Sequence, residues 1–208
     1  MKKIVILISG RGSNMQAIIE AKLPYKICGV FSNNPDAEGI SHAKHAGIET
    51  CVIDHRDYPD RVSYDEALGE SIETLNPDLI VLAGFMRILT PGIINRFSNR
   101  IINIHPSIIP AFTGLNTHNR ALAAGVRVHG CTVHFVTPDL DEGPIIAQAA
   151  LQIKSDDTPQ TLSKRVLALE HKILPKTITW ILEGLCSLSD GQVSLDPEIF
   201  DDSFYIQR

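Results

Sequence analysis

The sequence predicts an α/β fold, in which a mostly parallel but mixed sheet carries helices on both faces. Over the first hundred residues, apolar runs alternate with amphipathic stretches, as in repeated strand–helix units. The apolar runs are unbroken, which is typical of parallel strands buried on both faces. After residue 105, an alternating stretch and a further apolar run indicate an added hairpin, which makes the sheet mixed.

The elements of the first half follow from the residues that bound each run. Apolar runs between turn-forming or charged residues predict strands at 3–8, 26–32, 49–54, 77–85 and 100–104. Amphipathic stretches between these runs predict helices at 13–22, 36–46 and 61–75. Pro91 opens a shorter helix, because proline suits the first turn of a helix.

The second half begins with a change of pattern. The segment 105–118 is rich in proline, glycine and polar residues and predicts a long loop, with a short helix expected between His118 and His129. Strands at 130–137 and 143–153 form the predicted hairpin, and one long helix is expected over 158–185. Pro159 begins this helix and Pro175 predicts a kink. From residue 186 we expect a tail that has a turn at SDGQ (189–192) and ends in acidic, irregular sequence.

Composition and charge exclude several classes of protein. The chain of 208 residues is 44% hydrophobic and 21% charged, which is ordinary for a soluble globular protein. A formal net charge of −5 disfavours a dedicated nucleic-acid binder. No stretch approaches the ~20 apolar residues that a membrane span needs. The four cysteines have no zinc-ligand spacing and predict reduced thiols. We therefore expect a cytoplasmic protein, monomeric or homodimeric, that binds small molecules without nucleic acid, membrane or metal.

The segment ISGRGSNM (8–15), which joins the first strand to the first helix, predicts an anion site. Its glycines allow close approach of the backbone, and Ser13 and Asn14 stand beside the free amides of a helix N-terminus. A tight turn with a capping serine explains the same residues equally well. A dinucleotide fingerprint does not fit, because the third glycine is missing and no acidic residue ends the second strand. One phosphate group is the predicted ligand.

Polar residues end the strand at 100–104, where a buried strand should be apolar. Asn103 and His105 alternate with Ile104 and so point to the same side of the sheet. Asp141 follows in the turn of the added hairpin. An amide can donate to a developing oxyanion, and an imidazole can act as acid, base or cationic stabiliser. A lone buried histidine is more often a packed core residue. With no nucleophile elbow and no metal spacing, the three residues favour direct acyl transfer.

Other polar and apolar residues carry weaker signals. Phe85 to Leu89, at the carboxyl end of a predicted strand, could line an apolar slot for a flat ring or pad the core. His42 and His45 predict an exposed helix face. For His134, core packing and support of the site remain equally open. Glu170, with His171, interrupts the apolar stripe of the long helix, which indicates either a surface position or a place facing the phosphate site.

Five motifs in order, ISGRGSN, VLAGFMRIL, NIHPSIIP, HGCTVHFVTPDLDEGPII and EH, resemble the phosphoribosylglycinamide formyltransferase family from about residue 3 to 185. The resemblance implies a Rossmann-like formyltransferase fold with ligands across the carboxyl ends of the strands. It implies a domain at 1–185, with the phosphate site in its N-terminal half and the folate and catalytic residues in its C-terminal half, and a tail at 186–208. It also implies formyl transfer from 10-formyltetrahydrofolate to glycinamide ribonucleotide (GAR) in purine biosynthesis, with no metal.

The same resemblance assigns roles to individual residues. Asn103, His105 and Asp141 match the catalytic residues. The GAR-binding positions are Gly12, Ser13, Asn14 and Glu170. The folate-binding positions are Arg61, Met86, Arg87, Ile88, Leu89, Asn103, Thr137, Pro138, Asp139, Leu140 and Asp141. The chain departs from the family pattern at Ala111, Thr113 and Asn116, so the loop 110–118 is left outside the predicted site.

Three alternatives to this function remain open. A formyltetrahydrofolate deformylase would use water in place of the amine, but it normally has an extra N-terminal domain and lacks this glycine loop. A methionyl-tRNA formyltransferase has an additional C-terminal domain that binds tRNA, which the acidic charge disfavours. A non-catalytic nucleotide-binding module would bind ligand without transferring a formyl group.

Overall fold

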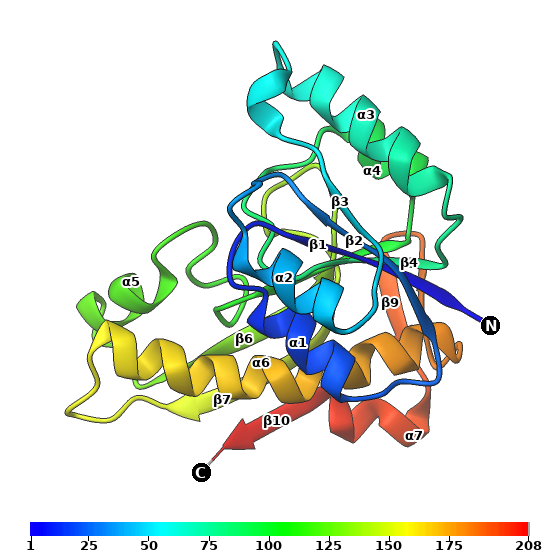
Figure 1. Ribbon diagram of the computed structural model, residues 1–208. Coiled ribbons are helices and arrows are strands. Elements are labelled where there is room, and N and C mark those ends of the chain that lie inside the picture. The colour runs from blue at the N-terminus through cyan, green and yellow to red at the C-terminus, as the bar shows by residue number, and fades with distance from the viewer. Residues whose placement is uncertain (208) are drawn as a thin grey trace. The chain divides into compact units, whose positions relative to one another are not determined.

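The computed structural model describes residues 1–207, which divide into two compact units (Figure 1). The first unit is Met1–Asn103, and the second begins at Ile104. Strand β5 (Ile101–His105) carries the chain from one unit into the next. The predicted catalytic residues Asn103 and His105 therefore lie on one strand but on either side of the boundary.

The first unit contains five parallel strands in the order β3-β2-β1-β4-β5. Their bounds are β1 Lys3–Ile8, β2 Lys26–Ser32, β3 Thr50–Val52, β4 Leu79–Leu82 and β5 Ile101–His105. Residues 4 to 8 of β1 are completely buried, as a central strand covered on both faces requires. The five strands that the sequence predicts are confirmed, although β3 and β4 are shorter than expected because turns replace their ends.

The helices of the first unit form two pairs. Their bounds are α1 Ser13–Glu20, α2 Glu38–His45, α3 Arg61–Glu73 and α4 Pro91–Arg96, with a short 3-10 helix, η1, at His55–Asp57. Helix α1 packs on α2, and α3 packs on α4 (Figure 1). The chain moves from β1 through β2 to β3 and then reverses to β4 on the other side of β1. Right-handed crossovers therefore place the two pairs on opposite faces.

This reversal of direction creates a natural place for a ligand. In open α/β sheets, ligands bind outside the carboxyl ends of the strands where the order reverses. Here that point lies between β1 and β4. The segments that leave it are the glycine loop after Ile8 and the segment Gly84–Thr90 after β4. Both were singled out from the sequence.

The second unit contains the predicted hairpin. Strand β6 (Val128–Phe135) pairs antiparallel with β7 (Ile145–Gln152), and β10 (Phe204–Gln207) pairs parallel with β7. The long helix α6 (Pro159–Leu182) packs on β6 and β7, and α5 (Thr117–Ala123) packs on α6 (Figure 1). Thr158 caps α6 through a reciprocal pair of hydrogen bonds with Thr161. Pro159 begins the helix as predicted, and α6 continues past the buried Pro175 to Leu182.

The C-terminal segment corrects one expectation. The predicted irregular tail is wrong, since residues 186 onward contain the hairpin of β8 (Cys186–Ser189) and β9 (Gln192–Leu195), helix α7 (Pro197–Phe200), a 3-10 helix η2 (Asp201–Ser203) and β10. The strands are short and contain polar residues, and an acidic run stands at 201–202, so no local pattern in the sequence predicted them. The described part of the chain contains no helix of the length and apolar character that crossing a membrane requires.

A buried histidine pair attaches α5 to β6. The Nδ1 of His118 lies 3.2 Å from the Nε2 of His129, and His129 is 1% exposed. His118 is the second residue of α5, so this helix begins at Thr117 and not after His118 as the sequence predicted. Burial lowers the pKa of His129 to about 4 and lowers that of His118 as well. Both rings are therefore neutral in the folded protein near pH 7.

This pair predicts a loss of stability in mild acid. An unfolded histidine has a pKa of about 6.5, so below that pH the unfolded state takes up a proton that folded His129 does not. Stability is complete above pH 6.5 and falls as the pH drops toward 4. We expect His129 to contribute about 2 kcal/mol to the difference in unfolding free energy between pH 7.5 and 5. Urea unfolding of His129→Gln should show that much less pH dependence. Equal pH dependence in the wild type and the variant would contradict the account, and the exposed His42→Gln serves as the control.

Candidate active site

The glycine loop after β1 presents the N-terminus of α1. Gly12 is the N-cap residue, with φ 74° and ψ 27°, and no side chain caps the helix there. A side chain at Gly12 would place Cβ 2.9 Å from the Cα of Gly39, at the start of α2. The amide of Gly39 donates to the carbonyl of Gly10 at 3.0 Å. The backbone here is held by a close glycine–glycine contact, and the first amides of α1 form the kind of site that binds a phosphate.

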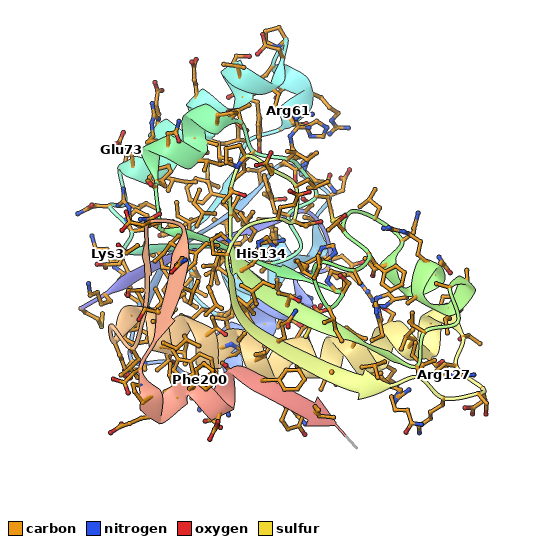
Figure 2. All side chains as sticks on the ribbon, turned by 180° about the vertical axis from the view of Figure 1, so that it is seen from behind. Lys3, Arg61, Glu73, Arg127, His134 and Phe200 are labelled. Carbon is orange, nitrogen blue, oxygen red and sulfur yellow. The ribbon has the colours of Figure 1, made fainter. Side chains whose placement is uncertain are left out.

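The segment after β4 exposes apolar side chains around one stacked arginine. Met86 is 65% and Ile88 43% exposed, whereas Leu89 is buried. The guanidinium of Arg87 lies over the ring of Tyr64 in α3, 4.8 Å from its centroid. Arg61 is the first residue of α3 and is exposed; in Figure 2, Arg61 and Glu73 mark the two ends of that helix. Exposed Met and Ile beside a fixed backbone suit an apolar ligand surface.

His105 and Asp141 form the buried polar centre of the second unit. The Nδ1 of His105 lies 3.3 Å from the Oδ2 of Asp141, and the two side chains are 7% and 8% exposed. Asp141 has φ 56°, a left-handed conformation that is uncommon outside glycine. Such backbone strain persists only where the surroundings impose it, and it gathers at functional sites. The predicted pairing of His105 with Asp141 is present.

Backbone groups of the loop 112–114 also contact His105 and Asp141. The Nε2 of His105 lies 3.0 Å from the carbonyl oxygen of Phe112, and the amide of Gly114 donates to Asp141 Oδ2 at 2.8 Å. A carbonyl accepts only, so Nε2 must carry a hydrogen, while Nδ1 faces a carboxylate. Both ring nitrogens thus face hydrogen-bond acceptors.

His134 supports Asp141 from the other side. It is 2% exposed on β6, near the centre of Figure 2, and its Nε2 lies 3.9 Å from Asp141 Oδ1. Its Nδ1 donates to the carbonyl of Phe135 at 2.9 Å. Burial lowers the pKa of His134, and the nearby charge of Asp141 opposes that shift. Of the two readings that the sequence left open, the structure favours support of the site.

Strand β6 also holds the loop that follows His105. The hydroxyl of Thr132 donates to the carbonyl of Ser107 at 2.7 Å and accepts from the amide of Ile109 at 3.1 Å. Gln148 on β7 donates to the carbonyl of Ile109 at 2.9 Å. The chain just beyond His105 is therefore fixed by buried side chains of the hairpin, which the sequence did not single out.

The remaining predicted positions in the second unit differ in exposure. Pro138, Asp139 and Leu140 are exposed and lead into the buried Asp141. Glu170 is 6% exposed on α6, so the expectation of a surface position is wrong. Burial and then the charge of Glu170 raise the pKa of the Cys131 thiol, which shows that the two side chains are neighbours. A buried carboxylate on an apolar helix is a candidate for binding.

The predicted site residues fall into two sets. Those in the first unit are Gly12, Ser13, Asn14, Arg61, Met86, Arg87, Ile88, Leu89 and Asn103. Those in the second are His105, Thr137, Pro138, Asp139, Leu140, Asp141 and Glu170. Within residues 1–207, no group of three or more His, Cys, Asp or Glu side chains is placed to hold a metal ion.

Comparison with known proteins identifies the family. The model of the formyl transferase family matches residues 2–178. The chain belongs to the formyl transferase family. It is 43% identical to the phosphoribosylglycinamide formyltransferase of Haemophilus influenzae, with 99% of each chain covered, and 44% identical to that of Escherichia coli, with 93% of each covered.

Solved structures of formyl transferases agree with the fold. The phosphoribosylglycinamide formyltransferase of Coxiella burnetii has a TM-score of 0.92 at 47% identity, with 100% of this chain and 99% of that chain covered. Glycinamide ribonucleotide transformylase 1 of Symbiobacterium toebii has a TM-score of 0.91 at 43% identity, with 94% of each covered. The predicted Rossmann-like α/β fold and the assignment as a transferase are confirmed.

Proposed function

We propose that this formyl transferase moves the formyl group of 10-formyltetrahydrofolate to the amine of GAR, giving formyl-GAR and tetrahydrofolate in de novo purine biosynthesis. Relatives named for this activity match over nearly the whole chain. The observation that carries the proposal is the buried His105–Asp141 pair at the end of a polar-ended strand. An enzyme of this kind works in the cytoplasm on small molecules.

The nucleotide is proposed to bind at the glycine loop. Gly12 brings the backbone close, and the amides at Ser13 and Asn14 face the phosphate of GAR at the positive end of α1. Glu170 carries a negative charge suited to the cationic or hydrogen-bond-donating parts of the substrate, such as its hydroxyls and amine. Backbone amides alone can therefore hold the phosphate, so a net charge of −5 is compatible with an anionic substrate.

The formyl donor is proposed to bind along the segment Met86–Leu89, with Arg61, the half-buried Thr137 and the exposed residues 138–140. Met86 and Ile88 offer apolar contact to a flat ring, and the backbone between them offers hydrogen bonds. Asn103 and Asp141 are proposed to contact the reacting formyl group. No metal takes part in this proposal.

The reaction is a direct transfer. The amine nitrogen of GAR attacks the formyl carbon, and a tetrahedral adduct forms with negative charge on its oxygen. Asn103 and the Nε2–H of His105 stabilise that oxyanion, while Asp141 orients His105 and balances its charge. The adduct collapses by breaking the bond from the formyl carbon to N10 of the folate, and the amine proton passes through Asp141 to N10. The Phe112 carbonyl gives up His105 Nε2 for this step, so the loop 112–114 must move when substrates bind.

Tetrahydrofolate release separates this function from its rivals. We supply 10-formyltetrahydrofolate with and without GAR and follow the tetrahydrofolate formed. The proposed transferase releases it only when GAR is present. Release without GAR indicates a deformylase, and no release under either condition indicates a non-catalytic module. Either of these results contradicts the proposal.

A further inference from the structure

The segment Gly84–Thr90, which includes the proposed folate positions, is held at both ends by side chains and backbone of the first unit. The amide of Ser9 donates to the carbonyl of Gly84 at 3.1 Å, and the amide of Met86 donates to the hydroxyl of Ser9 at 2.8 Å. At the far end, the amide of Thr90 donates to Asp65 Oδ2 at 2.5 Å. Between these points, Met86 and Ile88 are exposed and can face a ligand.

Asp65 is an unusual residue for its place on α3. It is 2% exposed, and burial raises the pKa of its carboxyl group. The charges of Arg87 and Arg61 act on it, but among residues 1–207 no cation forms an ion pair with it and its Oδ1 has no hydrogen-bond partner. A buried carboxylate without an ion pair is destabilising, and an apolar residue would pack there better. Natural sequences depart from the rules of packing chiefly at functional positions.

Two neighbouring residues of α3 contact the segment Gly84–Thr90. Tyr64 stacks on Arg87, and the next residue of α3, Asp65, accepts a hydrogen bond from the amide of Thr90. These two neighbouring residues of α3 therefore hold the segment at two positions that are three residues apart. Thr90 is also the N-cap residue of α4, and its ψ of 158° marks the point where the segment turns into that helix. The backbone of 87–89 is thereby fixed between two points of α3.

We propose that Asp65 is a positioning residue for the formyl donor. Its hydrogen bond to Thr90 fixes the backbone of Arg87–Leu89 in the shape that binds the flat heteroaromatic ring of the folate. Asp65 does not contact the ligand and has no part in the transfer itself. This inference rests on the proposed function, because that function places the folate on Met86–Leu89.

The test compares Asp65→Ala with Asp65→Asn, which keeps an oxygen that can accept from Thr90. For Asp65→Ala we expect KM for 10-formyltetrahydrofolate to rise on the order of 10-fold, as when a hydrogen bond to a charged group is lost. KM for GAR should stay within about 2-fold, since the glycine loop is unchanged. Asp65→Asn should keep KM for the donor within about 3-fold of the wild type.

Two matched controls separate positioning from general damage. Glu66→Ala removes the next carboxylate of α3, which is exposed. Gly69→Ala adds a methyl group 2.8 Å from Nη1 of Arg96, an exposed side chain that can move aside, so it changes the α4-facing side of α3 without touching the segment. Both controls should leave KM for the donor unchanged. An unchanged donor KM in Asp65→Ala, or an equal rise in Gly69→Ala, overturns the proposal.

Titration of tetrahydrofolate alone keeps the inference separate from the proposed function. The wild type is expected to bind tetrahydrofolate about 10-fold more tightly than Asp65→Ala, with Asp65→Asn close to the wild type. If the wild type binds tetrahydrofolate but transfers no formyl group, the proposed function fails and this titration still decides the role of Asp65. Equal binding by the wild type and Asp65→Ala overturns that role.

Discussion

Replacing His105 with alanine is expected to lower kcat for formyl transfer by about 10²–10³-fold, the loss typical of one oxyanion donor. His105 is buried, and its two ring nitrogens face the Phe112 carbonyl and the Asp141 carboxylate. Alanine removes the donor proposed for the oxyanion but leaves both substrate-binding segments intact. KM for GAR and for the donor should therefore change little, as steady-state kinetics with each substrate varied will show.

Asp141→Asn tests the same pair from the other side. Asparagine keeps the size of the side chain and tolerates the left-handed backbone, but it removes the charge that faces His105. We expect a fall in kcat of about 10²-fold or more. Glu142→Gln is the matched control, because it removes an exposed carboxylate from the adjacent position. Near-normal turnover in His105→Ala or Asp141→Asn would contradict the assignment.

Replacing Gly12 with alanine is expected to raise KM for GAR by about 10–100-fold, through the strain of positive φ and a contact with backbone. Gly12 has φ 74°, and the new Cβ would lie 2.9 Å from the Cα of Gly39. Neither backbone can yield without moving the amides at the start of α1, so phosphate binding suffers first.

Gly47→Ala is the control that separates the strain of a positive φ from the contact of a new Cβ with the backbone. Gly47 has a similar φ of 72°, but an added Cβ would meet nothing within 4 Å. It should lower the thermal midpoint less than Gly12→Ala does, because only the strain of positive φ remains, and it should leave KM for GAR unchanged. Equal KM values for GAR in both variants would show that the Gly12–Gly39 contact does not shape the phosphate site. The titration of GAR against each protein provides the measurement.

The order of strands and helices could be predicted because each leaves a local pattern. The unbroken run at 4–8 is a central strand, and the alternation at 130–137 belongs to the hairpin. The prediction for the C-terminal segment failed because strands of four residues, such as β8 and β10, are too short to show a pattern of apolar and polar residues. The boundaries of β3 and β4 depend on where neighbouring strands stop pairing, which no local pattern records.

Site residues could be predicted where they interrupt the apolar pattern of a buried strand. Asn103 and His105 stand out at the end of an apolar strand, Asp141 stands out in the turn of the hairpin, and the family resemblance named the substrates. Asp65 did not stand out, because α3 carries many acidic residues and the sequence does not show which one is buried. The Phe112 carbonyl and the Gly114 amide are backbone groups, so their contacts with the catalytic pair depend on loop geometry alone.

The central claim is that the formyl carbon passes directly from the folate to the amine of GAR at the His105–Asp141 pair. The most direct measurement supplies 10-formyltetrahydrofolate labelled in its formyl carbon, together with GAR, and follows the label in the wild type and in His105→Ala. The account predicts that the wild type places the label in formyl-GAR and that His105→Ala does so at least about 10²-fold more slowly. Label recovered as free formate, or transferred equally fast by both proteins, would contradict it.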